Sequence, residues 1–267
     1  MIRFTTFNNR KIRYSDEGTG VTVVLLHGYL ETLEIWKDFS ADLAKTFRVI
    51  SIDLPGHGES EIFSNVHSMD LMAGAVKTVL DSEEIGKCVL FGHSMGGYVT
   101  LAFADNYPER LLGFSLFHST PFPDTEEKKA SRNREIELIR QGKKDLIFKT
   151  NVPKGFATDN QEKLSDEVNR AMNLAFESPE EGIIAILNGM KIRPDRTEII
   201  KNSKVPFLWI LGKKDNYILY DGIKNKTEVN DRGEIFVLEN SGHMGFIEEK
   251  DAALQKVVEF VKNCKVN

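Results

Sequence analysis

The sequence predicts an α/β fold, in which an eight-stranded, mostly parallel sheet carries helices on both faces and an inserted helical segment. Short apolar runs rich in Val, Ile and Phe recur along the chain, and amphipathic segments separate them. Between residues 121 and 196 this alternation stops and helical patterning replaces it. Because 267 residues can bury one large core, we expect a single α/β domain that needs no disulfide bonds.

The apolar runs are the expected strands, and the amphipathic segments between them are the expected helices of the core. Strands are predicted at residues 2–7 and 11–16, as an opening hairpin, and then at 21–26, 47–52, 87–91, 111–117, 205–211 and 234–238. Helices are predicted at residues 33–45, 68–81, 95–107, 221–229 and 250–263.

The stretch from residue 121 to residue 196 is too long for a simple connection. Residues 124–140 and 165–176 are amphipathic, and Ser178 precedes Pro179 and two glutamates, which predicts a helix with Ser178 as its N-cap. We therefore expect a core domain of residues 1–120 and 197–267 and a helical cap of residues 121–196 over the strand ends. The alternative is that these helices extend the core away from any site.

The charges and the cysteines narrow the class of protein. The chain has 35 basic and 40 acidic residues, a formal net charge of −5, with the two signs interspersed, which disfavours a nucleic-acid partner. No signal peptide and no run of about 18 apolar residues occurs, so we expect a cytoplasmic protein with no membrane partner. Cys88 opens an apolar run and Cys264 lies in the polar tail, which indicates two reduced thiols. The sequence leaves monomer and homo-oligomer open.

A candidate nucleophile follows the apolar run that begins at Cys88. The run ends in Gly-x-Ser-x-Gly around Ser94, and helix-compatible sequence follows at once. Gly92 and Gly96 permit a tight strand-to-helix turn that exposes the Ser94 hydroxyl, and the Met95 amide is then free to bind an oxyanion. Three fixed positions match by chance in about one chain of this length in ten. The pattern therefore needs a base, an acid and a second oxyanion donor.

Three other strand ends supply those groups, since open parallel sheets bind ligands beyond the carboxyl ends of their strands. His27-Gly28-Tyr29 follows the third strand, and the Tyr29 amide is a candidate second donor. Asp215 follows the seventh strand and His243 lies in the loop after the eighth. Alone, Asp215 is equally a turn or cap residue and His243 a polar loop residue. Together, in the chain order Ser, Asp, His, they predict a catalytic triad.

At this point the sequence resembles the α/β-hydrolase superfamily, specifically its capped, single-domain, serine esterase-like members. The resemblance covers residues 22–260 and rests on the motifs at residues 27–28, 53–60, 92–97, 212–215 and 242–243. It implies Ser94 as nucleophile, His243 as base, Asp215 as acid, and the Tyr29 and Met95 amides as the oxyanion hole. Many relatives carry a proline soon after the acid, whereas this chain continues Asn-Tyr-Ile, which leaves the geometry of that loop open.

The histidines outside the predicted triad have structural interpretations, and the sequence shows no motif for a metal or a phosphate-containing cofactor. The resemblance implies that His27 and His93 support the oxyanion loop and the elbow, while His57 falls in a Gly/Pro turn and His67 is expected on the surface. No group of Cys, His, Asp and Glu has metal-ligand spacing, and Gly18-Thr19-Gly20 lacks the helix and lysine of a phosphate loop. We therefore expect no metal and no cofactor.

The predicted activity is hydrolysis of small to medium carboxylic esters through an acyl-enzyme, with a small-molecule acyl substrate as the partner. Serine in the elbow, where relatives that open epoxides or displace halide carry aspartate, argues against those two reactions. The residues expected to line the substrate pocket are Leu30, His118, Phe122, Phe156, Met190, Ile218 and Met244. His118 is otherwise a structural histidine, and the apolar residues are otherwise cap core. Carbon–carbon bond hydrolysis, lactone opening, perhydrolysis and a non-catalytic binding protein on the same scaffold remain alternatives.

Overall fold

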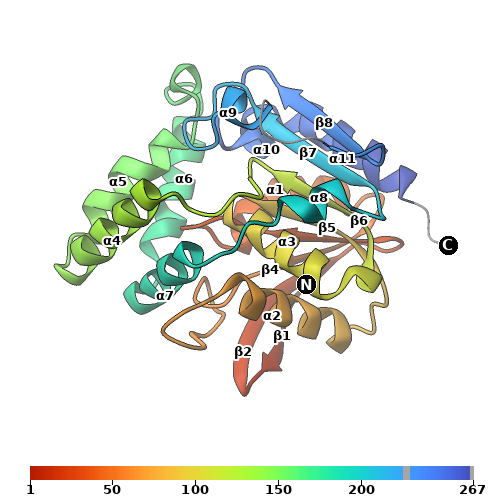
Figure 1. The fold of residues 1–267 in the computed structure, drawn as a ribbon, viewed down its shortest axis with the longest axis horizontal. Helices are drawn as coiled ribbons and strands as arrows, with labels where there is room; N and C mark the ends of the chain where they lie inside the picture. The colour runs from red at the N-terminus through yellow and green to blue at the C-terminus, as the bar shows by residue number, and fades with distance from the viewer. Residues whose placement is uncertain (225–228, 265–267) are drawn as a thin grey trace.

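A computed structural model describes residues 1–224 and 229–264, and in this part of the chain eight strands form one sheet (Figure 1). The strand order is β1-β2-β4-β3-β5-β6-β7-β8. The β1–β2 and β2–β4 pairs are antiparallel and the other five pairs are parallel, which confirms the predicted mostly parallel sheet. The strands are β1 (Ile2–Phe7), β2 (Arg10–Glu17), β3 (Thr22–Leu26), β4 (Arg48–Ile52), β5 (Cys88–His93), β6 (Leu111–Phe117), β7 (Phe207–Gly212) and β8 (Gly233–Leu238).

Side chains alternate between the two faces of the sheet and divide the core into two layers. Val24 and Leu26 of β3 pack in the same cluster as α2 (Met69–Ser82) and α3 (Met95–Asn106). Val23 and Leu25 face the opposite cluster, which includes residues of α1 (Lys37–Leu43) and α11 (Lys250–Asn263). Every side chain of β3 is buried, as expected for a central strand covered by helices on both faces.

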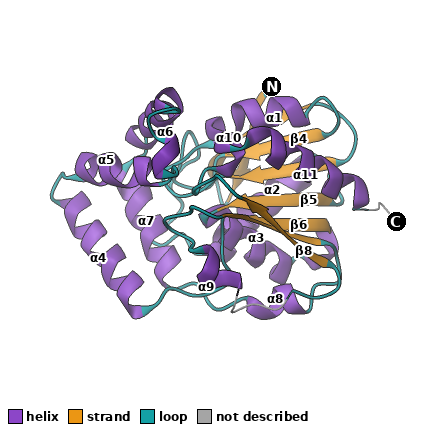
Figure 2. Ribbon diagram, turned by 90° about the horizontal axis from the view of Figure 1, so that it is seen from above, coloured by secondary structure: helices purple, strands orange, loops and turns teal. Residues whose placement is uncertain are grey.

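The helical segment, residues 121–196, lies between β6 and β7. Its two ends meet, because the Arg196 amide donates to the Pro121 carbonyl at 2.9 Å. Figure 2 shows α4 to α7 gathered at one end of the strands. The helices of this part of the chain are α4 (Glu126–Arg140), α5 (Lys144–Lys154), η3 (Thr158–Asn160), α6 (Ser165–Phe176), α7 (Glu180–Lys191) and, just beyond it, α8 (Thr197–Lys201).

Three details differ from the sequence-based expectations, and a fourth lies partly outside the described residues. The segment predicted as one helix at 33–45 is a 3-10 turn, η1 (Leu33–Trp36), followed by α1. Pro179, not Ser178, is the N-cap of α7. β7 begins at residue 207, two residues later than predicted, because Pro206 has no N–H to donate to the ladder. The helix predicted at 221–229 falls partly on residues 225–228, outside the described residues, and its described part is α9 (Tyr220–Lys224).

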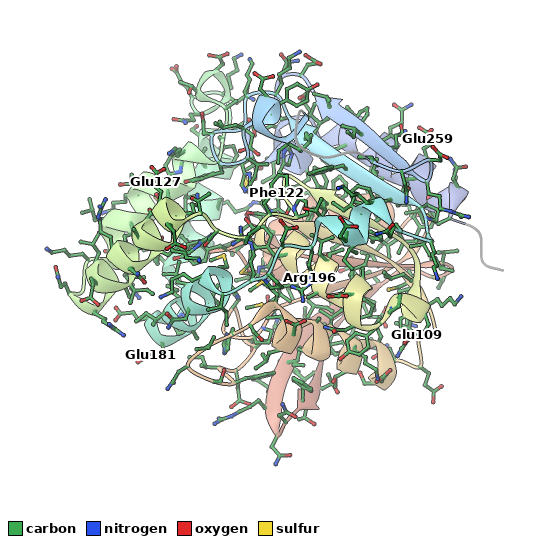
Figure 3. All side chains as sticks on the ribbon, viewed as in Figure 1. Glu109, Phe122, Glu127, Glu181, Arg196 and Glu259 are labelled. Atoms are coloured by element: carbon green, nitrogen blue, oxygen red, sulfur yellow. The ribbon has the colours of Figure 1, made fainter. Side chains whose placement is uncertain are left out.

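Four short elements and α5 were not predicted, because none carries a clear apolar periodicity. The short ones are η2 (Pro108–Arg110), η3, α8 and α10 (Gly245–Glu248). Among the described helices none is long and apolar enough to cross a membrane. Figure 3 shows side chains over the whole described chain, with Phe122 and Arg196 near the two ends of the helical segment.

Candidate active site

Ser94 occupies the sharp turn between β5 and α3. Its backbone is in the left-handed region, with φ 50° and ψ −112°, a conformation that costs energy for any residue with a Cβ. The strand pairing holds this turn, since the Ser94 amide donates to the Phe117 carbonyl at 2.9 Å and the Ser119 hydroxyl donates to the Ser94 carbonyl at 2.6 Å. Position 96 must be glycine, because a Cβ there would lie 2.5 Å from the Leu26 carbonyl oxygen. The turn presents Ser94 half-buried at the cavity surface.

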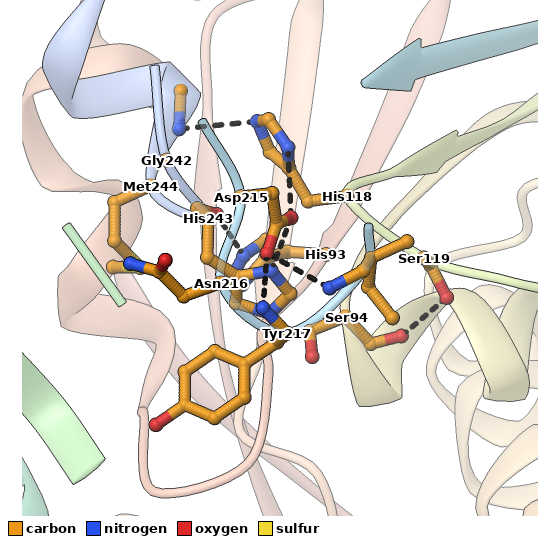
Figure 4. Close-up of polar contacts among 12 residues, drawn as sticks. His93, Ser94, His118, Ser119, Asp215, Asn216, Tyr217, Gly242, His243 and Met244 are labelled. Atoms are coloured by element: carbon orange, nitrogen blue, oxygen red, sulfur yellow. Dashed lines mark hydrogen bonds and ion pairs between the residues drawn. The ribbon is translucent and has the colours of Figure 1, made fainter. Parts of the chain in front are cut away.

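His243 and Asp215 lie in contact at the ends of β8 and β7 (Figure 4). Nδ1 of His243 is 2.7 Å from Oδ2 of Asp215. The other carboxylate oxygen of Asp215 accepts the amides of Tyr217 at 2.7 Å and Ile218 at 2.9 Å. Because an ionised carboxylate only accepts hydrogen bonds, the proton of neutral His243 lies on Nδ1, and Nε2 is free to take a proton.

The charge on Asp215 is fixed by its surroundings. Asp215 is 4% exposed, and burial alone would raise its pKa. The charge of His243 and the hydrogen bonds from His118 and His243 outweigh burial and hold the pKa of Asp215 far below its usual range. The site therefore keeps an anion beside the imidazole near neutral pH.

His118 lies behind the triad and does not line the cavity, so the expectation that it contacts substrate needs correcting. It is fully buried, and its Nε2 accepts the Gly245 amide at 3.1 Å. Its Nδ1, which then carries the proton, is 3.5 Å from Oδ2 of Asp215, at the outer limit of a hydrogen bond. Burial lowers the pKa of His118 to about 4, so it is neutral near pH 7. His118 is thus placed to orient the acid.

A buried ion pair joins the oxyanion loop to the loop of His243. Glu31 accepts the Gly28 amide at 2.6 Å and lies 2.9 Å from Nδ1 of His93. Nε2 of His93 is 2.8 Å from the His243 carbonyl oxygen. Both ring nitrogens of His93 therefore face acceptors and both must donate, so His93 is an imidazolium. Burial opposes that charge, but Glu31 raises the pKa of His93 above its usual value.

The two candidate oxyanion donors flank Ser94. Met95 is the first residue of α3, and Tyr29 follows β3 next to Leu30, which has φ 64°. Within residues 1–224 and 229–264 neither amide donates to a protein acceptor. The Tyr29 hydroxyl donates to Glu135 of α4 at 2.7 Å, so this loop also contacts the helical segment.

Two histidines follow β4, and only His67 differs from its simple interpretation, since His57 lies in the predicted turn. His67 was expected on the surface, but it is fully buried and its Nε2 accepts the Phe63 amide at 3.1 Å. It lies under α7, where its own amide donates to the Ala185 carbonyl at 2.9 Å. His57 is also buried, against His27, whose Nε2 accepts the Leu54 amide at 3.0 Å. Packing against other elements, invisible in local sequence, buries both.

A cavity of about 500 Å³ connects Ser94, His243 and the helical segment. Six residues predicted for the pocket line it, namely Leu30, Phe122, Phe156, Met190, Ile218 and Met244. The wall is more polar than expected, because it also carries Asp124, Lys128, Arg132, Glu135, Lys154 and Arg193. In the part of the chain that the structure describes, no group of three or more His, Cys, Asp or Glu side chains could hold a metal ion.

The sequence analysis missed these polar wall residues and Glu31. One signal was available in α4: Arg132, Ile136 and Ile139 recur at helical spacing, and all three are buried. An arginine on the apolar stripe of a helix indicates a buried partner, which here is Asp124. No local signal marks Arg193, which reaches the same carboxylate from beyond the end of α7.

Known proteins resemble the chain over nearly its whole length. A family model described as alpha/beta hydrolase fold matches residues 21–135. The 2-hydroxy-6-oxononadienedioate/2-hydroxy-6-oxononatrienedioate hydrolase of Escherichia coli O81 (strain ED1a) is 30% identical over 272 residues, which cover 94% of this chain and 91% of that protein. The chain belongs to the α/β-hydrolase family and is a hydrolase.

Solved structures agree with this assignment. A thermophilic esterase from Thermogutta terrifontis, with malate bound, superposes with a TM-score of 0.93 at 28% identity, covering 99% of this chain and 98% of that chain. The enol-lactonase from Burkholderia xenovorans LB400 superposes with a TM-score of 0.90 at 22% identity, covering 97% of this chain and all of that one, and shows the same fold.

Proposed function

We propose that this protein is a serine hydrolase that cleaves small to medium carboxylic esters through an acyl-enzyme intermediate. The observation that carries the proposal is the geometry around one cavity. Ser94 sits there on a strained turn, and His243, held by Asp215 through Nδ1, lines the same cavity with Nε2 unengaged. A weak alcohol nucleophile needs such a base beside it.

In this mechanism His243 takes the Ser94 proton while the hydroxyl oxygen attacks the ester carbonyl. The Tyr29 and Met95 amides bind the tetrahedral oxyanion. His243 then protonates the departing alkoxide, and the Ser94 ester of the acyl group remains. A water molecule activated by His243 hydrolyses that ester and returns the proton to Ser94. Asp215 stabilises the imidazolium in both halves and is never protonated, and no cofactor takes part.

The helical segment acts in this proposal as a cap over the site, with residues 1–120 and 197–267 as the core domain. Phe122, Phe156 and Met190 of the segment line the cavity together with Leu30, Ile218 and Met244 of the core. Met190→Ala, which enlarges the cavity from the cap side, should shift the preferred acyl chain toward longer esters in a series of p-nitrophenyl esters. An unchanged chain-length profile would place substrate elsewhere.

A second candidate uses the same triad on a carbon–carbon bond. The E. coli relative is named as a hydrolase of an oxo-dienedioate, which is an oxo acid and not an ester. The polar cavity wall also suits an oxo acid better than an alkyl ester. Product analysis with paired ester and 1,5-diketone substrates separates the two reactions.

The decisive test of the proposed function compares wild type with Ser94→Ala on that ester series. Removing the nucleophile should lower kcat by at least about a thousandfold, leaving only the contribution of binding and the oxyanion donors. The melting temperature should change little, since one hydroxyl is lost at the cavity surface. Ester turnover retained by a folded Ser94→Ala, or diketone cleavage without ester cleavage by wild type, contradicts the proposal.

A further inference from the structure

Four cationic side chains line the wall of the cavity formed by the helical segment: Lys128, Arg132, Lys154 and Arg193, here called the cationic cluster. The two arginines share one carboxylate. Nε of Arg132 is 2.5 Å from Oδ2 of Asp124, and Nη1 of Arg193 is 2.6 Å from Oδ1. All three side chains are nearly inaccessible, with exposures of 9% for Arg132, 6% for Arg193 and 1% for Asp124.

The charges of this wall do not balance. Asp124 neutralises one of the two arginines, and Glu135, which accepts the Tyr29 hydroxyl, is the other carboxylate near them. Burial raises the pKa of Glu135, which weakens its charge further. Among the described residues neither Lys128 nor Lys154 ion-pairs with a carboxylate. Although Lys128 and Lys154 are exposed, four cations beside Asp124 and a weakly charged Glu135 give the cavity wall an excess of positive charge, which favours an anion there.

The cluster lies beside the reacting groups. Tyr98 is one helical turn after Ser94, about 6 Å along α3, and the Arg193 guanidinium carbon is 3.9 Å from the Tyr98 ring centroid. On the other side, the Tyr217 ring centroid is 5.3 Å from that of His243. Nζ of Lys154 and Nζ of Lys128 are 5.3 Å and 5.9 Å from the same Tyr217 ring. An anion on the cluster is therefore only a short chain away from a carbonyl at Ser94.

We propose that the cationic cluster binds a carboxylate of the substrate, so that the preferred ester carries a free carboxylate a few bonds from the scissile carbonyl. This inference rests on the proposed function and names its substrate class. Planar guanidinium groups suit a carboxylate, and the two ammonium groups add charge without fixed geometry. The ion pairs with Asp124 and the bonds from Arg193 to the Phe122 and Met190 carbonyls give both arginines a structural role. They give none to Lys128 and Lys154, which line the same cavity without a carboxylate partner among the described residues.

The kinetic test uses monoethyl esters of succinic, glutaric and adipic acid. Each is compared with the ethyl ester in which the free carboxyl is a primary amide, so that size is matched and only the charge differs. A second pair carries the carboxylate on the alcohol side, as acetyl-3-hydroxypropionate and its amide. At least one carboxylate substrate should exceed its amide in kcat/KM by roughly tenfold. Raising the salt concentration should reduce this ratio.

Substitutions of the two lysines test whether the cationic cluster causes the preference for carboxylate substrates. Lys128→Met should lower the carboxylate-to-amide ratio by roughly fivefold, and Lys128→Met combined with Lys154→Met should lower it further. Lys129→Met is the matched control, because Lys129 is the next residue of α4, pairs with Glu126 at 2.8 Å and does not line the cavity. These lysines hold no buried partner, so the variants leave the Asp124 cluster intact. A ratio near one in wild type, or an equal fall in the Lys129→Met control, overturns the proposal.

A binding measurement tests the carboxylate site independently of the proposed ester hydrolysis. Glutarate should raise the melting temperature of Ser94→Ala, while glutaramide at the same concentration should not, and Lys128→Met should reduce the shift. If wild type hydrolyses neutral esters but shows neither the kinetic ratio nor the glutarate shift, this inference fails and the proposed function stands. If no ester is hydrolysed but glutarate still binds, the proposed function fails and the anion site stands.

Discussion

The two walls of the cavity are built by different means. The strand-end wall, with Tyr29, Ser94, Asp215 and His243, is positioned by backbone: four strand ends and two residues with positive φ, Leu30 and Ser94, of which Ser94 forms a sharp turn. The helical wall, from residues 121–196, is positioned by side-chain ion pairs such as Arg132 with Asp124. This difference explains why a single sequence predicts the candidate catalytic residues more readily than the residues that select the substrate. Backbone turns leave glycine signatures in the sequence, whereas ion pairs between separate helices do not.

The two walls are nevertheless joined at His243. The His243 amide donates to the Gly155 carbonyl at 2.6 Å. Glu248 of α10 accepts the amides of Ala157 at 2.9 Å and Gly242 at 2.9 Å. The loop of His243 therefore rests on the end of α5, so the helical segment supports the candidate active site through backbone contacts.

The largest effect among the tests of this comparison is expected from Gly242→Ala. A Cβ at position 242 would lie 2.4 Å from the Ala157 nitrogen and 2.9 Å from the Gly155 carbonyl oxygen, and backbone cannot yield as a side chain does. Displacing His243 by about 1 Å should lower kcat by roughly a hundredfold. Gly86→Ala is the control, since a Cβ there meets nothing within 4 Å. The measurement is steady-state kinetics of ester hydrolysis for both variants. A kcat equal to that of wild type in Gly242→Ala would show that the position of His243 does not depend on its contact with the helical wall.

A second test compares, in acid, one buried histidine behind the strand-end wall with one packed under the helical segment. Burial lowers the pKa of His118, behind the triad, and of His67, under α7, to about 4 in each case. The unfolded chain binds these protons at about pH 6.5 and the folded protein does not, so the free energy of unfolding should fall as the pH drops from 6.5 toward 4. Each histidine contributes about 3 kcal/mol over that window.

Urea unfolding at several pH values between 6.5 and 4.5 measures this slope. His118→Gln and His67→Gln should each make it shallower. The His93–Glu31 pair, with a raised and a lowered pKa, stays ionised in the folded protein, so it opposes the fall near pH 6.5, where the unfolded histidine gains its proton, and adds to it near pH 4.5, where the unfolded glutamate does. Glu135, whose pKa is raised, acts in the opposite direction and opposes part of the effect. A wild-type slope in both variants would contradict the assignment of neutral buried histidines.

The smallest effect is expected where the walls touch through a single side-chain contact. Tyr29→Phe removes the hydroxyl that donates to Glu135 at 2.7 Å, but keeps the ring and the Tyr29 amide position. Because the amide itself remains available, kcat/KM for a neutral ester should fall only a few-fold, by about 1 kcal/mol. A loss of a hundredfold or more would mean that the helical wall holds the oxyanion loop in place.

Patterns within short stretches of sequence explain how much of the fold and of the candidate site could be predicted. Ser94, Asp215 and His243 each follow an apolar run that predicts a strand. The pattern that predicts the strands therefore also predicts the candidate triad. The same patterns fail for His118, where the strand-end position is right but the side chain turns beneath Asp215. They fail again for the pocket wall, because no local pattern marks Arg193, which reaches Asp124 from beyond the end of α7. Residues that depend on contacts between distant segments need the folded chain.

The central claim is that Ser94 is the nucleophile activated by His243. It is tested most directly by a small fluorophosphonate, which forms a stable phosphonyl ester only with an activated serine. Intact-protein mass spectrometry of wild type should show one adduct per chain, peptide mapping should place it on Ser94, and His243→Gln should react far more slowly. An adduct on another residue such as Ser119, or none on Ser94 in a preparation that turns over esters, would contradict the claim.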